Sequence, residues 1–129
     1  MAIAQRLSSL AQVANLTHDA ESFSLAWRDF LDGFYEAPSG EKLQEEPPLL
    51  TPLLQDGGYA DAFLAGMAEY LAGRNGFAIP RWCLQPSRIA TVPYFAMKTY
   101  EGRVFLLLES PSEFRARNVF ISADALTRV

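Results

Sequence analysis

The side chains in this sequence that could act as a nucleophile or as a general base are few and far apart. The only histidine, His18, is expected at a helix start between Thr17 and Asp19. A catalytic base must lie within hydrogen-bond distance of the group that it deprotonates, and the region around His18 has no glycine-rich turn that would present a nucleophile. We therefore interpret His18 as an exposed residue near a helix cap.

Cys83, the only cysteine, follows Trp82 in a proline-rich segment. A reactive thiol needs a lowered pKa, which cationic neighbours such as Arg81 and Arg88 could provide. We favour a buried, unreactive thiol and keep the reactive thiol as the alternative.

Metal and cofactor sites are not expected. One histidine and one cysteine cannot complete a zinc site of the usual nitrogen and sulfur ligands. The carboxylates of Asp56, Asp61 and Glu69 are scattered rather than set in a loop of alternating ligands, and we interpret Asp61 and Glu69 as solvated residues on a helix face. Asp56-Gly57-Gly58 lacks the preceding strand and following lysine of a phosphate-binding loop. The sequence thus predicts no catalytic residue, no metal and no cofactor.

The only basic cluster consists of Arg115 and Arg117, with Arg128 near the C-terminus. Guanidinium groups bind carboxylates and phosphates through paired hydrogen bonds, so Arg115 and Arg117 are candidate partner-binding residues. The alternative is that they form salt bridges with acidic residues of this chain.

Aromatic residues supply two further candidate sites. The helix expected from Thr17 to about Glu36 carries an apolar stripe that is either core or a docking face, made of Phe23, Trp27, Phe30, Leu31 and Phe34. If this stripe is exposed, Trp27 and Phe30 are candidate partner-binding residues, and a dimer through 23–34 is possible. In the segment 77–98, an apolar ligand pocket could instead be lined by Trp82, Cys83, Tyr94 and Phe95.

Helices have to position these residues. Ile3, Leu7, Leu10 and Ala14 form a stripe that predicts a helix over 2–16, and the helix after it is capped by Thr17. The clearest helix is 59–74, because its apolar residues repeat every 3.6 residues and Asn75-Gly76 offers a left-handed stop. Gly66 on its apolar face should let a neighbouring helix approach closely.

Shorter elements follow from local signals. We expect helical pieces over 41–46, after Thr51-Pro52, after Ser87 and after Ser122, and a helix over 111–117 started by a Ser110–Glu113 capping box and stopped by Asn118. Residues 99–109 fit either a helix or a strand, with Tyr100, Val104, Leu107 and Leu108 forming the helix stripe. We choose the helix because no second strong strand is present and Phe120-Ile121 is too short to supply one.

The predicted fold class is all-α: a compact multi-helix single domain, 1–129, with a long proline-punctuated connecting segment. Residues 1–46 should form a helical pair that packs on a helical body, 49–129. A chain of 129 residues, half of them hydrophobic, can bury such a core without metal or disulfide.

Charge and cysteine content exclude several classes. The net charge of −4 and the pI of about 4.9 disfavour nucleic-acid binding and docking on an anionic membrane. A single cysteine, no secretory signal and no apolar run of membrane-spanning length predict a cytoplasmic protein.

Three stretches carry a resemblance to a known family: 61–72 (DAFLAGMAEYLA), 76–82 (GFAIPRW) and 109–121 (ESPSEFRARNVFI). Over about 59–129 the chain resembles an uncharacterised bacterial domain found alone or behind helix-turn-helix domains of the XRE type. Members are often encoded beside nucleotidyltransferase-like proteins. The resemblance implies an antitoxin-like, non-catalytic protein whose partner is such a neighbour. Residues 1–58 do not fit a helix-turn-helix, so DNA binding is not implied here.

Three functions remain open at this point. The first is a protein-interaction module that buries an apolar patch against one partner. The second is a small-molecule-binding protein or small enzyme with the apolar pocket near Trp82. The third is a DNA-binding regulator, which would need a basic face. The oligomeric state is not predicted.

Overall fold

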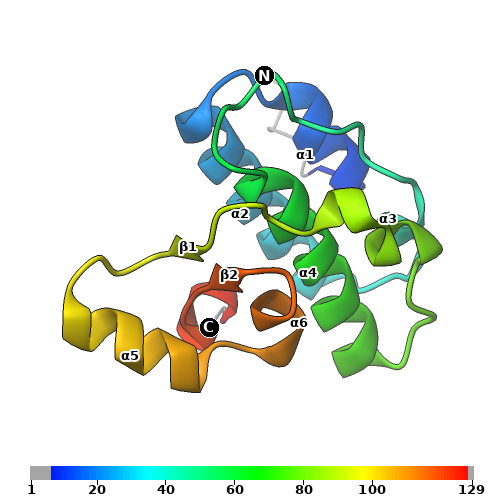
Figure 1. Ribbon diagram of the computed structural model, residues 1–129. Coiled ribbons are helices and arrows are strands. Elements are labelled where there is room, and N and C mark those ends of the chain that lie inside the picture. Colours follow the sequence, from blue (N-terminus) through cyan, green and yellow to red (C-terminus); the bar gives the residue numbers. More distant parts are fainter. Residues whose placement is uncertain (1–6, 128–129) are drawn as a thin grey trace, which may run out of the picture.

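The computed structural model describes residues 7–127, and most of them are helical (Figure 1). The α-helices are α1 (Leu10–Leu16), α2 (Ala20–Glu36), α3 (Glu41–Gln44), α4 (Tyr59–Asn75), α5 (Tyr100–Glu109) and α6 (Ser112–Arg115). Single turns of 3-10 helix are η1 (Arg81–Leu84), η2 (Pro86–Arg88) and η3 (Ala123–Leu126), and the strands are β1 (Tyr94–Phe95) and β2 (Val119–Phe120). Ile3 and Arg128, which entered the predictions above, lie outside the described residues.

Helix α4 forms the centre of the core. Gly58 before it and Gly76 after it both have positive φ, 86° and 71°, a conformation that glycine adopts without strain. From residue 60 to 68 the helix is buried on every side, because its alanines and Gly66 let neighbours approach all round. Phe114 of α6 lies directly over Gly66, as the expectation of a close approach required.

Asp19, and not Thr17, caps α2. The Asp19 carboxylate accepts the Ser22 backbone N–H at 2.7 Å, and the Ser22 hydroxyl oxygen accepts the Asp19 N–H at 3.0 Å. Thr17 instead ends α1, where its hydroxyl donates to the Val13 carbonyl at 2.8 Å. The sequence correctly predicted a side-chain cap at the start of α2, but the capping residue lies two positions further along the chain than predicted.

Aromatic rings join α2 to α4. The Phe63 ring lies 5.9 Å from that of Phe23 and 4.8 Å from that of Trp27, centroid to centroid. Phe30 and Phe34 are fully buried. The apolar stripe of α2 therefore faces the core, and the idea of a dimer through 23–34 is wrong.

The segment 45–58 between α3 and α4 contains no helix, although Thr51-Pro52 predicted one; that peptide bond is cis. The backbone N–H groups of Leu50 and Thr51 donate to the Asp61 carboxylate at 2.6 and 3.2 Å. These two bonds fix the segment on α4.

The structure of the segment after α5 also differs from the predicted capping box and helix. The Ser110 hydroxyl donates to the Leu106 carbonyl at 2.6 Å and ends α5, so it does not cap the next helix. Pro111 occupies the N-cap position of α6, which is a single turn. Asn118 has a φ of 66° and stops the chain from continuing as a helix, as predicted.

A short pair of parallel strands adds to the helices. Tyr94 and Phe95 pair with Val119 and Phe120, and the Phe95 and Phe120 rings stack with centroids 4.6 Å apart. Strands of two residues leave no periodic signal in a sequence. The fold is thus mostly helical, with one small sheet in the described chain. Between residues 7 and 127, no helix combines the length and apolar character needed to cross a membrane.

Candidate functional site

Helix α5 lies at one edge of the molecule, away from α1, α2 and α4 (Figure 1). Thr99 begins it, since its hydroxyl oxygen accepts the Gly102 N–H at 3.0 Å, and Ser110 ends it. The choice of helix over strand for 99–109 is confirmed. Its main neighbour is β2.

The apolar stripe of α5 faces solvent. The buried residues of the helix are Gly102 and Leu106, one turn apart on the inner face. The outer face carries exposed apolar side chains: Tyr100 (79% exposed), Val104 (38%), Phe105 (46%), Leu107 (46%) and Leu108 (70%). These five residues are called the α5 face below. A contiguous apolar surface of this kind is typical of an interaction site.

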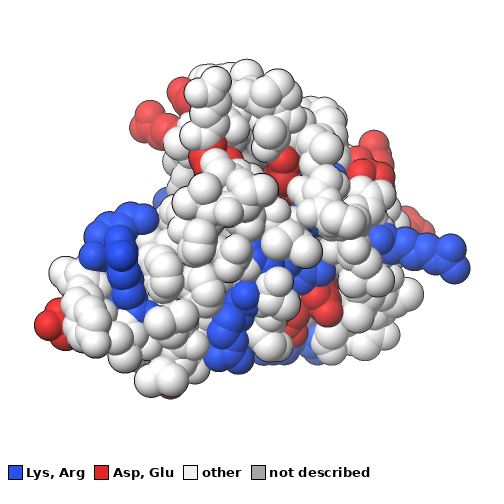
Figure 2. Space-filling view, in the orientation of Figure 1, with Lys and Arg blue, Asp and Glu red and all other residues white. Residues whose placement is uncertain are grey.

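Basic side chains border the α5 face. Arg103 lies over the Phe95 ring at 5.4 Å, and Lys98 lies over the Tyr94 ring at 4.7 Å. Arg115 is also near, because its Nη1 donates to the Leu107 carbonyl at 3.2 Å. Figure 2 shows basic side chains along this edge of the molecule together with acidic ones, and Glu101 and Glu109 of the helix are exposed.

The two arginines of the predicted partner-binding cluster have different roles. Arg115 is exposed, whereas Arg117 is 5% exposed. Nη1 of Arg117 donates to Glu69 Oε1 and to the Glu113 carbonyl, both at 2.7 Å, and Nη2 donates to the Cys83 carbonyl at 2.8 Å. Arg117 is therefore a buried structural residue that is not available to a partner, and a basic face for DNA loses one of its members.

The aromatic candidates on α2 are not on the surface either. Phe30 is fully buried and Trp27 is 5% exposed. Their assignment as partner-binding residues is corrected, because packing on α4 uses the same stripe. Periodicity identified the apolar face correctly and could not tell what covers it.

The residues predicted to form a pocket near Trp82 do not share one. Trp82 and Cys83 are buried in η1. Phe95 packs on β2, while Tyr94 stacks on Tyr59 of α4 with centroids 3.9 Å apart. If the protein has an apolar ligand pocket, that pocket lies elsewhere than beside Trp82.

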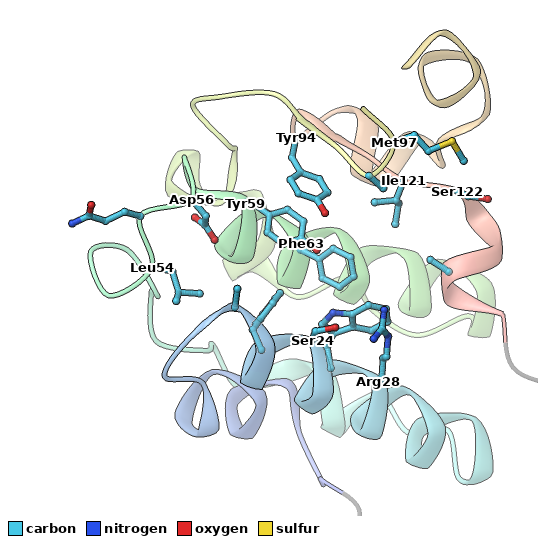
Figure 3. A pocket seen from close by; sticks show the side chains of 16 residues that line it. Ser24, Arg28, Leu54, Asp56, Tyr59, Phe63, Tyr94, Met97, Ile121 and Ser122 are labelled. Atoms are coloured by element: carbon cyan, nitrogen blue, oxygen red, sulfur yellow. The ribbon is translucent and has the colours of Figure 1, made fainter. Parts of the chain in front are cut away.

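Tyr94 lines a different pocket, which lies between α2, α4 and the C-terminal segment (Figure 3). Its volume is about 530 Å³, within the range of about 300–1,000 Å³ of small-molecule sites. We call it the aromatic pocket, because the rings of Phe23, Trp27, Tyr59, Phe63 and Tyr94 are among the residues that line it. This pocket could not be predicted from the sequence, since these rings come from three segments far apart in the chain.

Arg88 is a fully buried arginine that sequence reasoning considered only as a neighbour of Cys83. Its Nη2 donates to the Pro47 carbonyl and lies 3.6 Å from Glu46 Oε2, and its Nη1 lies 3.7 Å from Asp61 Oδ1. Burial lowers the pKa of Arg88, and the two carboxylates oppose this effect. Asp61 is 2% exposed, so its interpretation as a solvated residue is wrong. Arg88 and Asp61 together hold the 45–58 segment on α4.

Cys83 is 1% exposed, and burial raises the pKa of its thiol despite the opposing charge of Arg117. The thiol donates to the Pro80 carbonyl, with Sγ 2.8 Å from the oxygen. Because only the thiolate is nucleophilic, Cys83 is inert in the folded protein at neutral pH. The buried-thiol interpretation therefore fits this environment.

We predict that a disulfide reagent such as DTNB modifies Cys83 at least about 100-fold more slowly in the folded protein than in denaturant, because the thiol is protonated and reached only through opening. A matched control is Leu84→Cys in a Cys83→Ala background, since Leu84 is 67% exposed. That thiol should react fast without denaturant. Equal rates for Cys83 in the folded and unfolded protein would contradict the assignment.

His18 is exposed and lies 3.5 Å from the Asp19 carboxylate. Backbone and side-chain hydrogen bonds from Ser22 lower the pKa of Asp19. Within residues 7–127, no group of three or more histidine, cysteine and acidic side chains could hold a metal ion.

Comparison of the chain with family models, curated proteins and solved structures finds no match in any of the three. The function therefore has to be inferred from the residues themselves.

Proposed function

We propose that this chain is a protein-interaction module that binds one protein partner through the α5 face. The observation that supports the proposal is the exposure of five large apolar side chains on one short helix. Burying a side chain of this size completely stabilises a complex by about 1.5–3 kcal/mol. A partner that covers several of them gains enough to offset the loss of rotational and translational freedom on association.

The geometry of the face fits one mode of recognition. An amphipathic helix that projects from a body is bound in an apolar groove of its partner. Lys98, Arg103 and Arg115 outnumber the acidic Glu101 and Glu109 on and beside the helix, so the face complements a groove with an acidic rim, and such charges favour orientation and rate of association more than affinity. The first partner to test is a nucleotidyltransferase-like neighbour, which the resemblance over 59–129 implies and which would make this chain antitoxin-like.

The test is a pair of double variants. Tyr100→Gln/Leu108→Gln changes the two most exposed residues of the α5 face, while Leu25→Gln/Leu84→Gln changes residues of similar exposure, 64% and 67%, elsewhere. Glutamine suits a helix, so neither pair should change the free energy of unfolding by more than about 1 kcal/mol in total. With the partner identified from the native locus, calorimetry should show at least about tenfold weaker binding for the α5 pair alone.

Two results would argue against the proposal. One is equal binding by both double variants. The other is a dimeric wild-type protein that the α5 pair converts to a monomer in light scattering, because the face would then contact a second copy of this chain.

A further inference from the structure

We propose that the aromatic pocket is a binding site for a small aromatic carboxylate, that is, a flat apolar ring system carrying one anionic group. This site is separate from the α5 face and does not depend on the function proposed for that face. The case for it comes from the shape of the pocket, from the rings that line it, and from the single cation at its rim.

The pocket exists because rings, rather than close backbone contact, join α2 to α4. Phe23, Trp27 and Phe63 bridge the two helices, and the stacked pair of Tyr59 and Tyr94 forms the wall beside them. Figure 3 shows Tyr59, Phe63 and Tyr94 beside one space, with Met97, Ile121 and Ser122 on the far side from Leu54. Because Phe23, Trp27 and Phe63 are at most 5% exposed, a ligand would meet mainly the half-buried rings of Tyr59 and Tyr94, and flat rings favour a flat ligand that can stack on them or meet them edge to face.

The charge at the rim selects an anion. Arg28 is exposed and lines the pocket, and its guanidinium lies 5.1 Å from the centre of the Trp27 ring. Among residues 7–127 no carboxylate forms an ion pair with Arg28. A guanidinium held over an aromatic ring keeps its N–H groups free for a carboxylate that enters beside that ring.

The acidic residue of the pocket sets the orientation of the ligand. The Asp56 carboxylate accepts the backbone N–H groups of Gly58 and Ala60 at 3.0 and 3.1 Å, and so it caps the start of α4. In Figure 3, Asp56 and Arg28 lie at opposite ends of the row of rings. A ligand therefore places its anionic group at the Arg28 end and its apolar end toward Leu54 and Asp56.

The tyrosine at the wall of the pocket does not add a second negative charge. Burial, and next the neighbouring Tyr94, raise the pKa of Tyr59, so its phenol stays protonated at any physiological pH. A protonated phenol carries no charge, so it does not repel an anion. The interior of the pocket is therefore compatible with the carboxylate that Arg28 selects.

The experiment compares 2-naphthoate with its neutral analogue 2-naphthamide, observed through the two tryptophan indole N–H signals in ¹H–¹⁵N spectra. Trp27 lines the pocket and Trp82 does not, so Trp82 is an internal control. Naphthoate should shift the Trp27 signal, with a dissociation constant of about 0.1–1 mM for a ligand of this size, and leave the Trp82 signal in place.

Variants then test each part of the site. Arg28→Gln should weaken naphthoate binding by about three- to fivefold, as expected for one exposed ion pair, and leave naphthamide binding unchanged. Arg81→Gln, another exposed arginine, should change neither. Ser24→Phe places a ring in the pocket and should abolish the binding of both compounds. The proposal is overturned if Trp27 does not respond to naphthoate, if Trp82 responds equally, or if Arg28→Gln weakens both compounds alike.

Discussion

Replacing Arg88 with alanine is expected to lower the free energy of unfolding by about 3–5 kcal/mol, because it removes one partner of a buried ion pair. Asp61 would stay buried without its countercharge. The Pro47 carbonyl would also lose its donor, and an unsatisfied buried acceptor costs about 1–3 kcal/mol. A domain of this size is stable by only about 5–15 kcal/mol, so this variant should be close to unfolding.

The loss of stability in Arg88→Ala arises from the contacts between the 45–58 segment and α4. The guanidinium connects Glu46 and Pro47 of the 45–58 segment to Asp61 of α4, and Asp61 holds the same segment through the N–H groups of Leu50 and Thr51. Loss of Arg88 therefore loosens a segment that covers one side of the central helix. A buried ion pair can often be replaced by apolar residues at little cost, but here such a replacement would leave the two N–H groups without an acceptor.

Urea denaturation followed by circular dichroism measures the effect. Arg81→Ala is the matched control, because Arg81 is exposed in the same stretch of chain, and it should change the free energy of unfolding by no more than about 0.5 kcal/mol. A loss of less than about 1 kcal/mol for Arg88→Ala, below the range for breaking a buried pair, would mean that the pair is not formed as described.

Two glycine-to-alanine changes on α4 are expected to have opposite signs. A Cβ at Gly66 would lie 2.7 Å from Cδ1 and 2.9 Å from Cε1 of Phe114, whereas a Cβ at Gly73 meets nothing within 4 Å. Overpacking costs about 1–3 kcal/mol, so Gly66→Ala should destabilise the protein. Gly73→Ala should stabilise it by about 0.5–1 kcal/mol, because alanine is the better helix former.

The same helix serves as host for both changes, so their difference reports packing alone. Thermal unfolding should place the midpoint of Gly66→Ala below that of the wild type and the midpoint of Gly73→Ala above it. Phe114→Leu combined with Gly66→Ala should recover part of the loss, since the ring that meets the new methyl group is then gone. Midpoints that move in the same direction for both single changes would contradict the close approach of α6 to Gly66.

The sequence predicted the elements governed by local signals. Helix α4 has glycines at both ends, and its predicted and observed bounds differ by one residue, although residues 60–68 are buried on every side rather than on one apolar face. Residues 99–109 were also correctly predicted as helical. Ser110 was misplaced because a serine before a proline can cap the next helix or end the one before it, and the Leu106 carbonyl decides between these.

The site depended on contacts that no local pattern reveals. The stripe on α2 and the stripe on α5 look alike in the sequence, yet Phe30 is fully buried and Leu108 is 70% exposed. Arg88 meets Pro47, 41 residues away, and Arg117 meets Glu69, 48 residues away. Periodicity states which residues share a face, whereas burial depends on which other part of the chain covers that face.

Helix α5 leaves the body after β1, and the chain rejoins the body at α6, before β2. The bonds from the Tyr94 N–H to the Asn118 carbonyl and from the Ala96 N–H to the Phe120 carbonyl, 2.9 and 3.0 Å, close the base of this excursion. Residues 97–109 are thus a candidate for a cooperative unit of their own, which can open sub-globally while α4 and α6 remain folded. The α5 face lies on this unit, which contacts the body through only a few buried side chains. Binding of a partner to the α5 face would therefore slow amide hydrogen exchange in residues 100–109 first, at a partner concentration too low to raise the temperature of global unfolding.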